Sequence, residues 1–62
     1  MPWIRGDYPP SYKNLPARIR NKAVEIANAL LIDHGFDEGL AIAVGVKRAK
    51  EWAKKQEQKK VN

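Results

Sequence analysis

Two apolar stripes at helical spacing, joined by a very short connection, are the feature that most constrains how this chain can fold. In each stripe, apolar residues recur at steps of three and four, which is the spacing of one helix face. The first stripe contains Ile19, Ala23, Ile26, Ala27 and Leu30, and the second contains Ile42, Val46, Ala49, Trp52 and Ala53. Because short connections favour antiparallel neighbours, the pattern predicts an all-α fold built on an antiparallel two-helix hairpin.

Residues with known capping preferences mark the expected ends of the two helices. Asn14 can cap the start of the first helix, and Pro16 suits its first turn. Gly35 suits a left-handed C-cap, and Asp37 can cap the second helix. The expected helices run over about 15–34 and 37–58, followed by a frayed tail over 59–62.

The opening segment, MPWIRGDYPPSYKNLP, is rich in proline and in large apolar side chains. A chain of 62 residues buries only about 60% of the surface that its unfolded form exposes, so these side chains are needed in the core. We expect residues 1–14 to form an extended clasp across the hairpin, with one short helical turn near 11–14. The residues predicted to make or receive the clasp are Trp3, Ile4, Tyr8, Tyr12, Leu15, Asn28 and Trp52. The range 1–62 is then a single small helical domain.

Asn28 is the polar residue of greatest interest in the first helix. It lies beside the apolar stripe, between Ala27 and Ala29. A half-buried amide that lacks hydrogen-bond partners costs about 1–3 kcal/mol. We therefore predict that the Asn28 side chain ties the backbone of the clasp to the first helix.

The net charge of +5 is concentrated in the last part of the chain. Residues 45–62 contain seven basic and two acidic residues, whereas residues 1–44 are balanced. Three more cations lie in the first two turns of the first helix, where the helix dipole disfavours each by about 0.3–1 kcal/mol. In an antiparallel hairpin, these cations share one end of the molecule with the later lysines, and the acidic residues near the turn occupy the other end. The predicted basic patch consists of Arg18, Arg20, Lys22, Lys47, Lys50, Lys54 and Lys55.

This basic patch has three interpretations. Lys47, Glu51 and Lys55 form a ladder at i,i+4 spacing, so part of the charge can be a solvated helix face. The patch can also contact nucleic-acid phosphates, with an affinity that falls as salt rises, or it can dock an acidic protein. No convincing helix-turn-helix spacing is visible. We expect a non-catalytic interaction or regulatory module that binds a protein partner, with a nucleic-acid-binding accessory protein as the alternative.

Catalytic and ligand-binding signals are absent from the sequence. Ser11 has no partner base, there is no thiol, and no glycine-rich loop of phosphate-cradling form occurs, so we expect neither an enzyme nor a cofactor. His34 has acidic neighbours, but these form an incomplete metal-ligand set, so we expect no metal. Leu40 and Val44 lie off the second stripe and must meet the clasp or a second copy. The oligomeric state stays open between these two, with the monomer favoured.

The Arg5-Gly6-Asp7 tripeptide matches the integrin-binding signal, but that function requires an extracellular loop. The first residues lack an apolar leader, no apolar run approaches the ~18–20 residues needed to span a bilayer, and there is no cysteine. We therefore expect a cytoplasmic protein without a membrane segment. In this context, Gly6 is predicted to supply a turn and Asp7 a side-chain cap.

Several stretches together resemble a family of small bacterial proteins of the YdaT type. They are PWIRGDYPPSYKNL, VEIANALL, the turn HGFDEG, and AKEWA. The chain is also more distantly similar to the ChaB family of putative cation transport regulators, through 14–16, 27–29 and 49–52. The resemblance implies a compact, mostly helical bacterial protein without a known catalytic residue set, so it transfers no catalytic or ligand residue.

Overall fold

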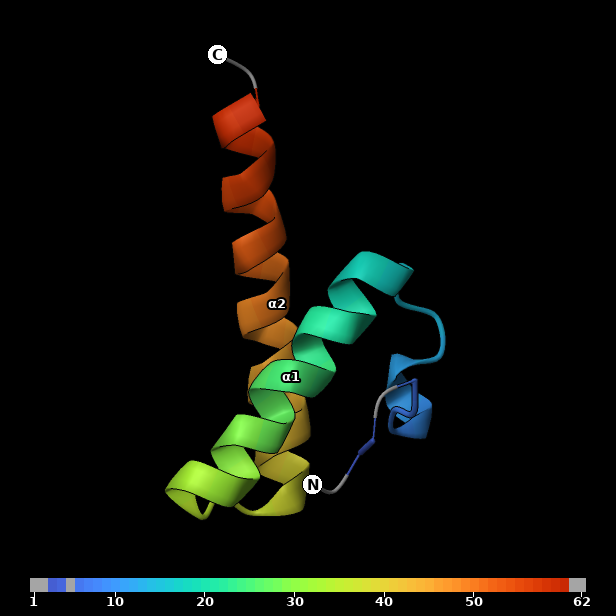
Figure 1. The fold of residues 1–62 in the computed structure, drawn as a ribbon, viewed down its shortest axis with the longest axis vertical. Coiled ribbons are helices and arrows are strands. Elements are labelled where there is room, and N and C mark those ends of the chain that lie inside the picture. The colour runs from blue at the N-terminus through green and yellow to red at the C-terminus, as the bar shows by residue number, and fades with distance from the viewer. Residues whose placement is uncertain (1–2, 5, 61–62) are drawn as a thin grey trace.

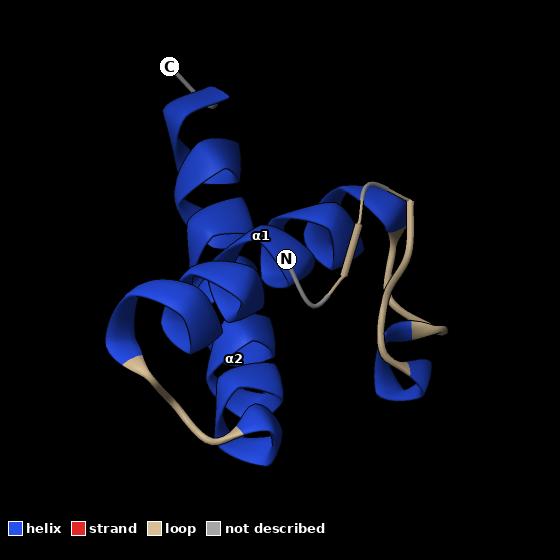
Figure 2. Cartoon of the chain, turned by 60° about the horizontal axis from the view of Figure 1, so that its bottom comes forward, coloured by secondary structure: helices blue, strands red, loops and turns tan. Residues whose placement is uncertain are grey.

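The chain folds into two long helices and one short helical turn. The computed structural model describes residues 3–4 and 6–60, with the side chains described up to residue 57. The elements are the 3-10 helix η1 (Pro10–Tyr12), the helix α1 (Ala17–His34) and the helix α2 (Glu38–Lys60). All other described residues are in loops and turns (Figure 2). The predicted all-α helical hairpin is confirmed, and the short extra turn lies at 10–12 rather than 11–14.

The first helix starts later than expected because Asn14 does not cap it. Asn14 lies in a turn in which the Leu15 N–H donates to the carbonyl of Tyr12, 3.1 Å away. Pro16 takes the N-cap position with an extended ψ of 142°, and its carbonyl receives the first helical bond, from Arg20. The prediction of an Asn14 cap was therefore wrong. The reason is that a proline holds the preceding residue out of the helical region.

The caps between the helices agree with the sequence. Gly35 ends α1 in the left-handed conformation, with φ of 64°, and its N–H donates to the carbonyl of Leu30. Asp37 Oδ2 accepts from the N–H groups of Gly39 and Leu40, at 3.1 and 3.4 Å. Both predicted caps are confirmed. At the other end, α2 continues to Lys60, through the first half of the expected frayed tail, and residues 61–62 lie outside the described range.

The two helices meet through small residues. Ala23 and Ala27 of α1 and Ala41 and Ala49 of α2 are fully buried. A Cβ placed on Gly45 would lie 2.9 Å from the Ala23 carbonyl oxygen, so the helix backbones approach closely there. Ridges of residues four apart that interlock in this way set helices at an oblique angle. Figure 1 shows this crossing, with the C-terminal half of α2 projecting beyond α1.

Tyr12 fills the space beside the helix crossing. Its side chain is fully buried against Ala23 and Ala49, and its hydroxyl donates a 2.7 Å hydrogen bond to the carbonyl of Ile42. Burial raises the pKa of the Tyr12 phenol above its ordinary value. Tyr8 and Leu15 pack against the same cluster. These three residues dock the N-terminal segment as predicted.

Trp3 and Asn28 fix the start of the clasp. The Trp3 N–H donates to Asn28 Oδ1 at 3.2 Å, and Asn28 Nδ2 donates to the Trp3 carbonyl at 2.9 Å. The predicted tie between Asn28 and the clasp is therefore confirmed. Trp3 packs against a second core cluster around Ala27, Leu30 and Ala41.

Ile4 does not dock in the core, so that part of the clasp prediction was wrong. Its side chain is 69% exposed. Trp3 packs against a core cluster, whereas Ile4 lines an open pocket beside the N-terminal loop. A turn follows at once, because the Asp7 N–H donates to the Ile4 carbonyl and Gly6 has φ of 90°.

The structural interpretation of the integrin-like tripeptide is confirmed for its last two residues. Gly6 supplies the turn through its positive φ. Asp7 Oδ1 accepts a 2.9 Å hydrogen bond from the Tyr8 N–H and so acts as a local cap. Arg5 lies outside the described residues. No described helix is long and apolar enough to cross a membrane.

Candidate interaction surface around Trp52

Two cations of α1 lie against one aromatic ring of α2. The Arg18 guanidinium carbon is 5.1 Å from the centroid of the Trp52 ring, and the Lys22 Nζ is 5.2 Å from it. Arg18 and Lys22 are four residues apart, so they lie on one face of α1. Trp52 is half-buried. A cation over an indole gains about 0.5–1 kcal/mol at a partly exposed site, which compensates for the unfavourable dipole at the start of α1.

Two cations of α2 flank the same tryptophan. Arg48 lies four residues before Trp52 and Lys55 three residues after it, so both are on its side of the helix. Both side chains are exposed. We call the set Arg18, Lys22, Arg48, Trp52 and Lys55 the Trp52 basic surface. Sequence reasoning missed Arg48, although its spacing from Trp52 was a signal that could have found it.

The remaining lysines of the predicted patch lie elsewhere on α2. Lys50 and Lys54 are two residues before and after Trp52, which places them on the far side of the helix at about 100° per residue. Lys47 also falls away from the Trp52 side. All three are exposed. The seven-residue patch is therefore not one continuous surface.

Arg20 contacts the clasp and is not part of the Trp52 basic surface. Its guanidinium carbon lies 4.6 Å from the centroid of the Tyr8 ring. Its Nε is buried and has no hydrogen-bond partner. An unpaired N–H of this kind opposes folding, and the aromatic contact offsets part of the cost. Arg20 thus helps to hold Tyr8 in place.

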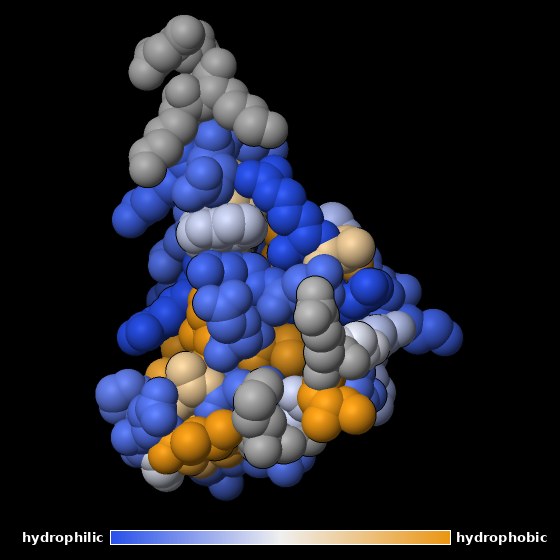
Figure 3. Space-filling view, in the orientation of Figure 1, coloured by the Kyte–Doolittle hydropathy of each residue, from blue (hydrophilic) through white to orange (hydrophobic). Residues whose placement is uncertain are grey.

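The charge of the molecule is unevenly distributed. Within the described part of the chain, the one ion pair is between Lys22 and Glu25, at 3.3 Å, and the Glu25 side chain is 70% exposed. Figure 3 shows hydrophilic atoms over the upper part of α2 and hydrophobic atoms gathered lower down, towards the turn between the helices. That turn also carries Asp33, Asp37 and Glu38, which are all exposed.

The remaining residues discussed in the sequence analysis are His34, Val44 and Leu40. His34 makes an edge-to-face contact with Phe36, with ring centroids 6.4 Å apart. No group of three metal-ligating side chains is found within 3–4 and 6–57. Val44 packs against the second core cluster, and Leu40 is 52% exposed.

The chain is thus a small all-α hairpin with an aromatic N-terminal clasp and a basic surface to which both helices contribute. The chain is similar to a protein of Bacillus subtilis (strain 168) described as the uncharacterised protein YdaT. The two are 55% identical over 53 residues, which make up 86% of this chain and 35% of that relative. The chain thus spans about a third of the length of the relative.

The predicted resemblance to YdaT-like proteins is confirmed by this similarity. No family model matches the chain, and no solved structure shows significant similarity to it. The more distant likeness to the ChaB family is not supported by these comparisons.

Proposed function

We propose that this chain is a non-catalytic interaction module that binds an acidic segment of a protein partner through the Trp52 basic surface. The observation that carries the proposal is the contact of Arg18 and Lys22 with one indole ring. The contact holds two cations in defined positions, so fewer side-chain rotamers remain to be ordered on binding. Carboxylates one helical turn apart on a partner could reach both of them.

The composition of this surface favours a protein partner over a nucleic acid. Tryptophan and arginine are the residues most enriched at the energetic centres of protein interfaces. The Trp52 ring is already contacted by Arg18 and Lys22, so it is a poor platform for stacking on a nucleotide base.

The proposal is tested by the fluorescence anisotropy of a labelled helical peptide in which glutamates recur at steps of three and four along one face and leucines along the other. An Arg18→Gln, Lys22→Gln variant should bind it at least tenfold more weakly at physiological salt, because two positioned charges are lost. The matched control is Lys50→Gln, Lys54→Gln, which removes the same charge from the far side of α2. The control should change the affinity less than threefold. Equal losses in both variants would show attraction by net charge alone and would overturn the proposal.

Nucleic-acid binding is the second candidate function. It is favoured by the lysines on the side of α2 that faces away from Trp52. Lys47, Lys50 and Lys54 are exposed along a helix that projects beyond α1. Such a helix can lie against phosphates without reading bases. Titration of labelled duplex DNA and single-stranded RNA at low and physiological salt tests this candidate. Binding that weakens with salt, and that the Lys50→Gln, Lys54→Gln variant loses, would support it.

A further inference from the structure

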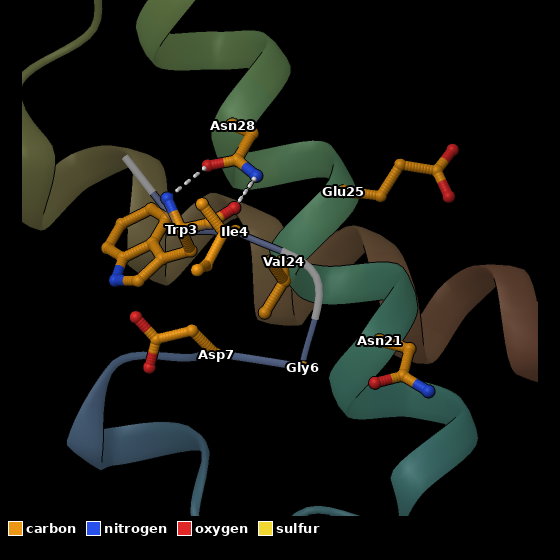
Figure 4. A pocket seen from close by; sticks show the side chains of 8 residues that line it. All are labelled: Trp3, Ile4, Gly6, Asp7, Asn21, Val24, Glu25 and Asn28. Carbon is orange, nitrogen blue, oxygen red and sulfur yellow. Dashed lines mark hydrogen bonds between the residues drawn. The ribbon is translucent and has the colours of Figure 1, made fainter. Parts of the chain in front are cut away.

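A pocket of about 640 Å³ lies between the N-terminal loop and α1 (Figure 4). None of its lining residues belongs to the Trp52 basic surface. The volume is within the range of small-molecule sites, about 300–1,000 Å³. The pocket is therefore large enough to hold a small ligand.

One side of the pocket is apolar. Trp3, Ile4 and Val24 line it, and Figure 4 shows Ile4 and Val24 pointing into the space between the loop and α1. The exposed side chain of Ile4 borders this pocket. An apolar ligand that covered it would be stabilised, because apolar surface would be removed from water. The two hydrogen bonds between Asn28 and the Trp3 backbone hold this wall in position.

The charged groups that line the pocket are both acidic, although the whole chain carries +5. Asp7 comes from the loop and Glu25 from α1, and Glu25 is already paired with Lys22. The Asp7 carboxylate is oriented by the Tyr8 N–H, and no cation among the described residues pairs with it. A carboxylate beside an indole ring is a combination that attracts organic cations, since both groups favour positive charge.

We propose that this pocket binds an alkylammonium group carried on an apolar stem. The stem would lie against Trp3, Ile4 and Val24, and the ammonium would face Asp7. The group could come from a free amine or from a lysine side chain of another protein, because the recognised chemistry is the same. The proposal is independent of the role given to the Trp52 basic surface.

The experiment is a titration of the ¹⁵N-labelled chain, followed by amide chemical shifts. Phenethylamine is the probe, and phenethyl alcohol and phenylpropionate are its neutral and anionic counterparts. Phenethylamine should give saturating shifts at Trp3, Gly6 and Val24, with a dissociation constant in the millimolar range expected for a small ligand. N-acetyl-lysine amide replaces the free amine to test a protein-borne source. Tighter binding of one of the two amines identifies the source and supports the shared chemistry.

The charge of Asp7 is tested by Asp7→Asn, which keeps a side-chain oxygen to cap Tyr8 and so preserves the loop. This variant should weaken phenethylamine binding about five- to tenfold. Asp33→Asn is the matched control, because it removes one carboxylate from the far end of α1, and it should leave the affinity unchanged. Binding of phenethyl alcohol as tight as that of the amine would overturn the proposal. So would shifts that do not saturate, or equal effects of the two variants.

Discussion

Asn28 joins segments that are 25 residues apart in sequence. Its amide forms two hydrogen bonds with the backbone of Trp3, one as acceptor and one as donor. The side chain is 95% buried, so neither group can be replaced by water without a change in the fold. A single residue therefore sets the position of the N-terminal loop.

Replacing Asn28 should destabilise the chain strongly. Asn28→Ala leaves the Trp3 backbone groups unpaired, so we expect the free energy of unfolding to fall by about 1–3 kcal/mol. Chemical denaturation followed by circular dichroism measures the change. Asn21→Ala is the control, because Asn21 is an exposed residue of the same helix, and it should be neutral or slightly stabilising. A similar loss in both variants would contradict the role of Asn28.

Gly45 should not tolerate a methyl group. A Cβ there would lie 2.8 Å from the Tyr12 hydroxyl and 2.9 Å from the Ala23 carbonyl oxygen. The helix-propensity gain of Gly45→Ala, about 1 kcal/mol, should be outweighed by an overpacking cost of about 1–3 kcal/mol. At Gly39, the nearest atom is the end of the Asp37 side chain at 3.3 Å, so Gly39→Ala should be tolerated. Thermal melts of the two variants check this difference, and a more stable Gly45→Ala would refute the close crossing.

Tyr12 should make the stability depend on alkaline pH. Burial raises the pKa of its phenol, so the folded state holds this proton more tightly than the unfolded state does. The contribution is complete below the ordinary pKa of about 10 and is lost as the pH rises through the folded pKa. The wild-type chain should therefore lose stability above about pH 10 faster than Tyr12→Phe. Parallel melting curves across that range, with Tyr8→Phe as the comparison, provide the measurement.

At the scale of elements, the clasp completes a hairpin whose fully buried residues are mostly small. The buried contacts between α1 and α2 are mostly alanines and Gly45, which bury little apolar area. The clasp adds large aromatic side chains, with Tyr12 in one core cluster and Trp3 against the other. The hairpin therefore depends on the N-terminal segment for much of its burial.

Removing the clasp should unfold the hairpin or lower its melting temperature by more than about 15 °C. The estimate follows from the loss of several kcal/mol of apolar burial, with each kcal/mol worth about 4–8 °C in a domain of this size. Deletion of residues 1–12 tests the expectation, with circular dichroism as the readout. An unchanged melting temperature would show that the segment is a tail. Deletion from residue 58 onwards is the control, and it should have a small effect.

The elements were predictable from sequence because their signals are local. Apolar periodicity gave both helices, and Gly35 and Asp37 marked the caps between them. The start of α1 was missed because Pro16 prevents Asn14 from acting as a cap. The exposure of Ile4 was also missed, since it depends on the turn at Gly6.

At the scale of the whole molecule, the predicted gathering of basic charge is only partly one surface. The helical phase separates Lys50 and Lys54 from Trp52, and Arg20 turns to the clasp. The sequence predicted that the basic residues lie near one end of the molecule. It could not show which face of α2 contacts Arg18 and Lys22. That depends on the oblique crossing, which arises from the close contact at Gly45.

The chain should be a monomer in solution. Its large exposed apolar residues among those described are Ile4, Ile32 and Leu40, too few for the apolar interface of a stable dimer. Sedimentation at micromolar concentration should give a mass near 7.0 kDa. Leu40→Lys should leave it unchanged. A concentration-dependent rise in mass that Leu40→Lys abolishes would instead identify a second copy as the partner of Leu40.

The hydrogen bond from Tyr12 to Ile42 also bears on the order of events during synthesis. Tyr12 leaves the ribosome well before its acceptor carbonyl on α2, and Ala49 of its packing cluster follows later still. Until then, Tyr12 and Trp3 have only part of their binding sites and stay accessible to water or to chaperones. Because the late segment completes the early contacts, folding over these residues should occur as one cooperative step once the region around Ala49 has emerged.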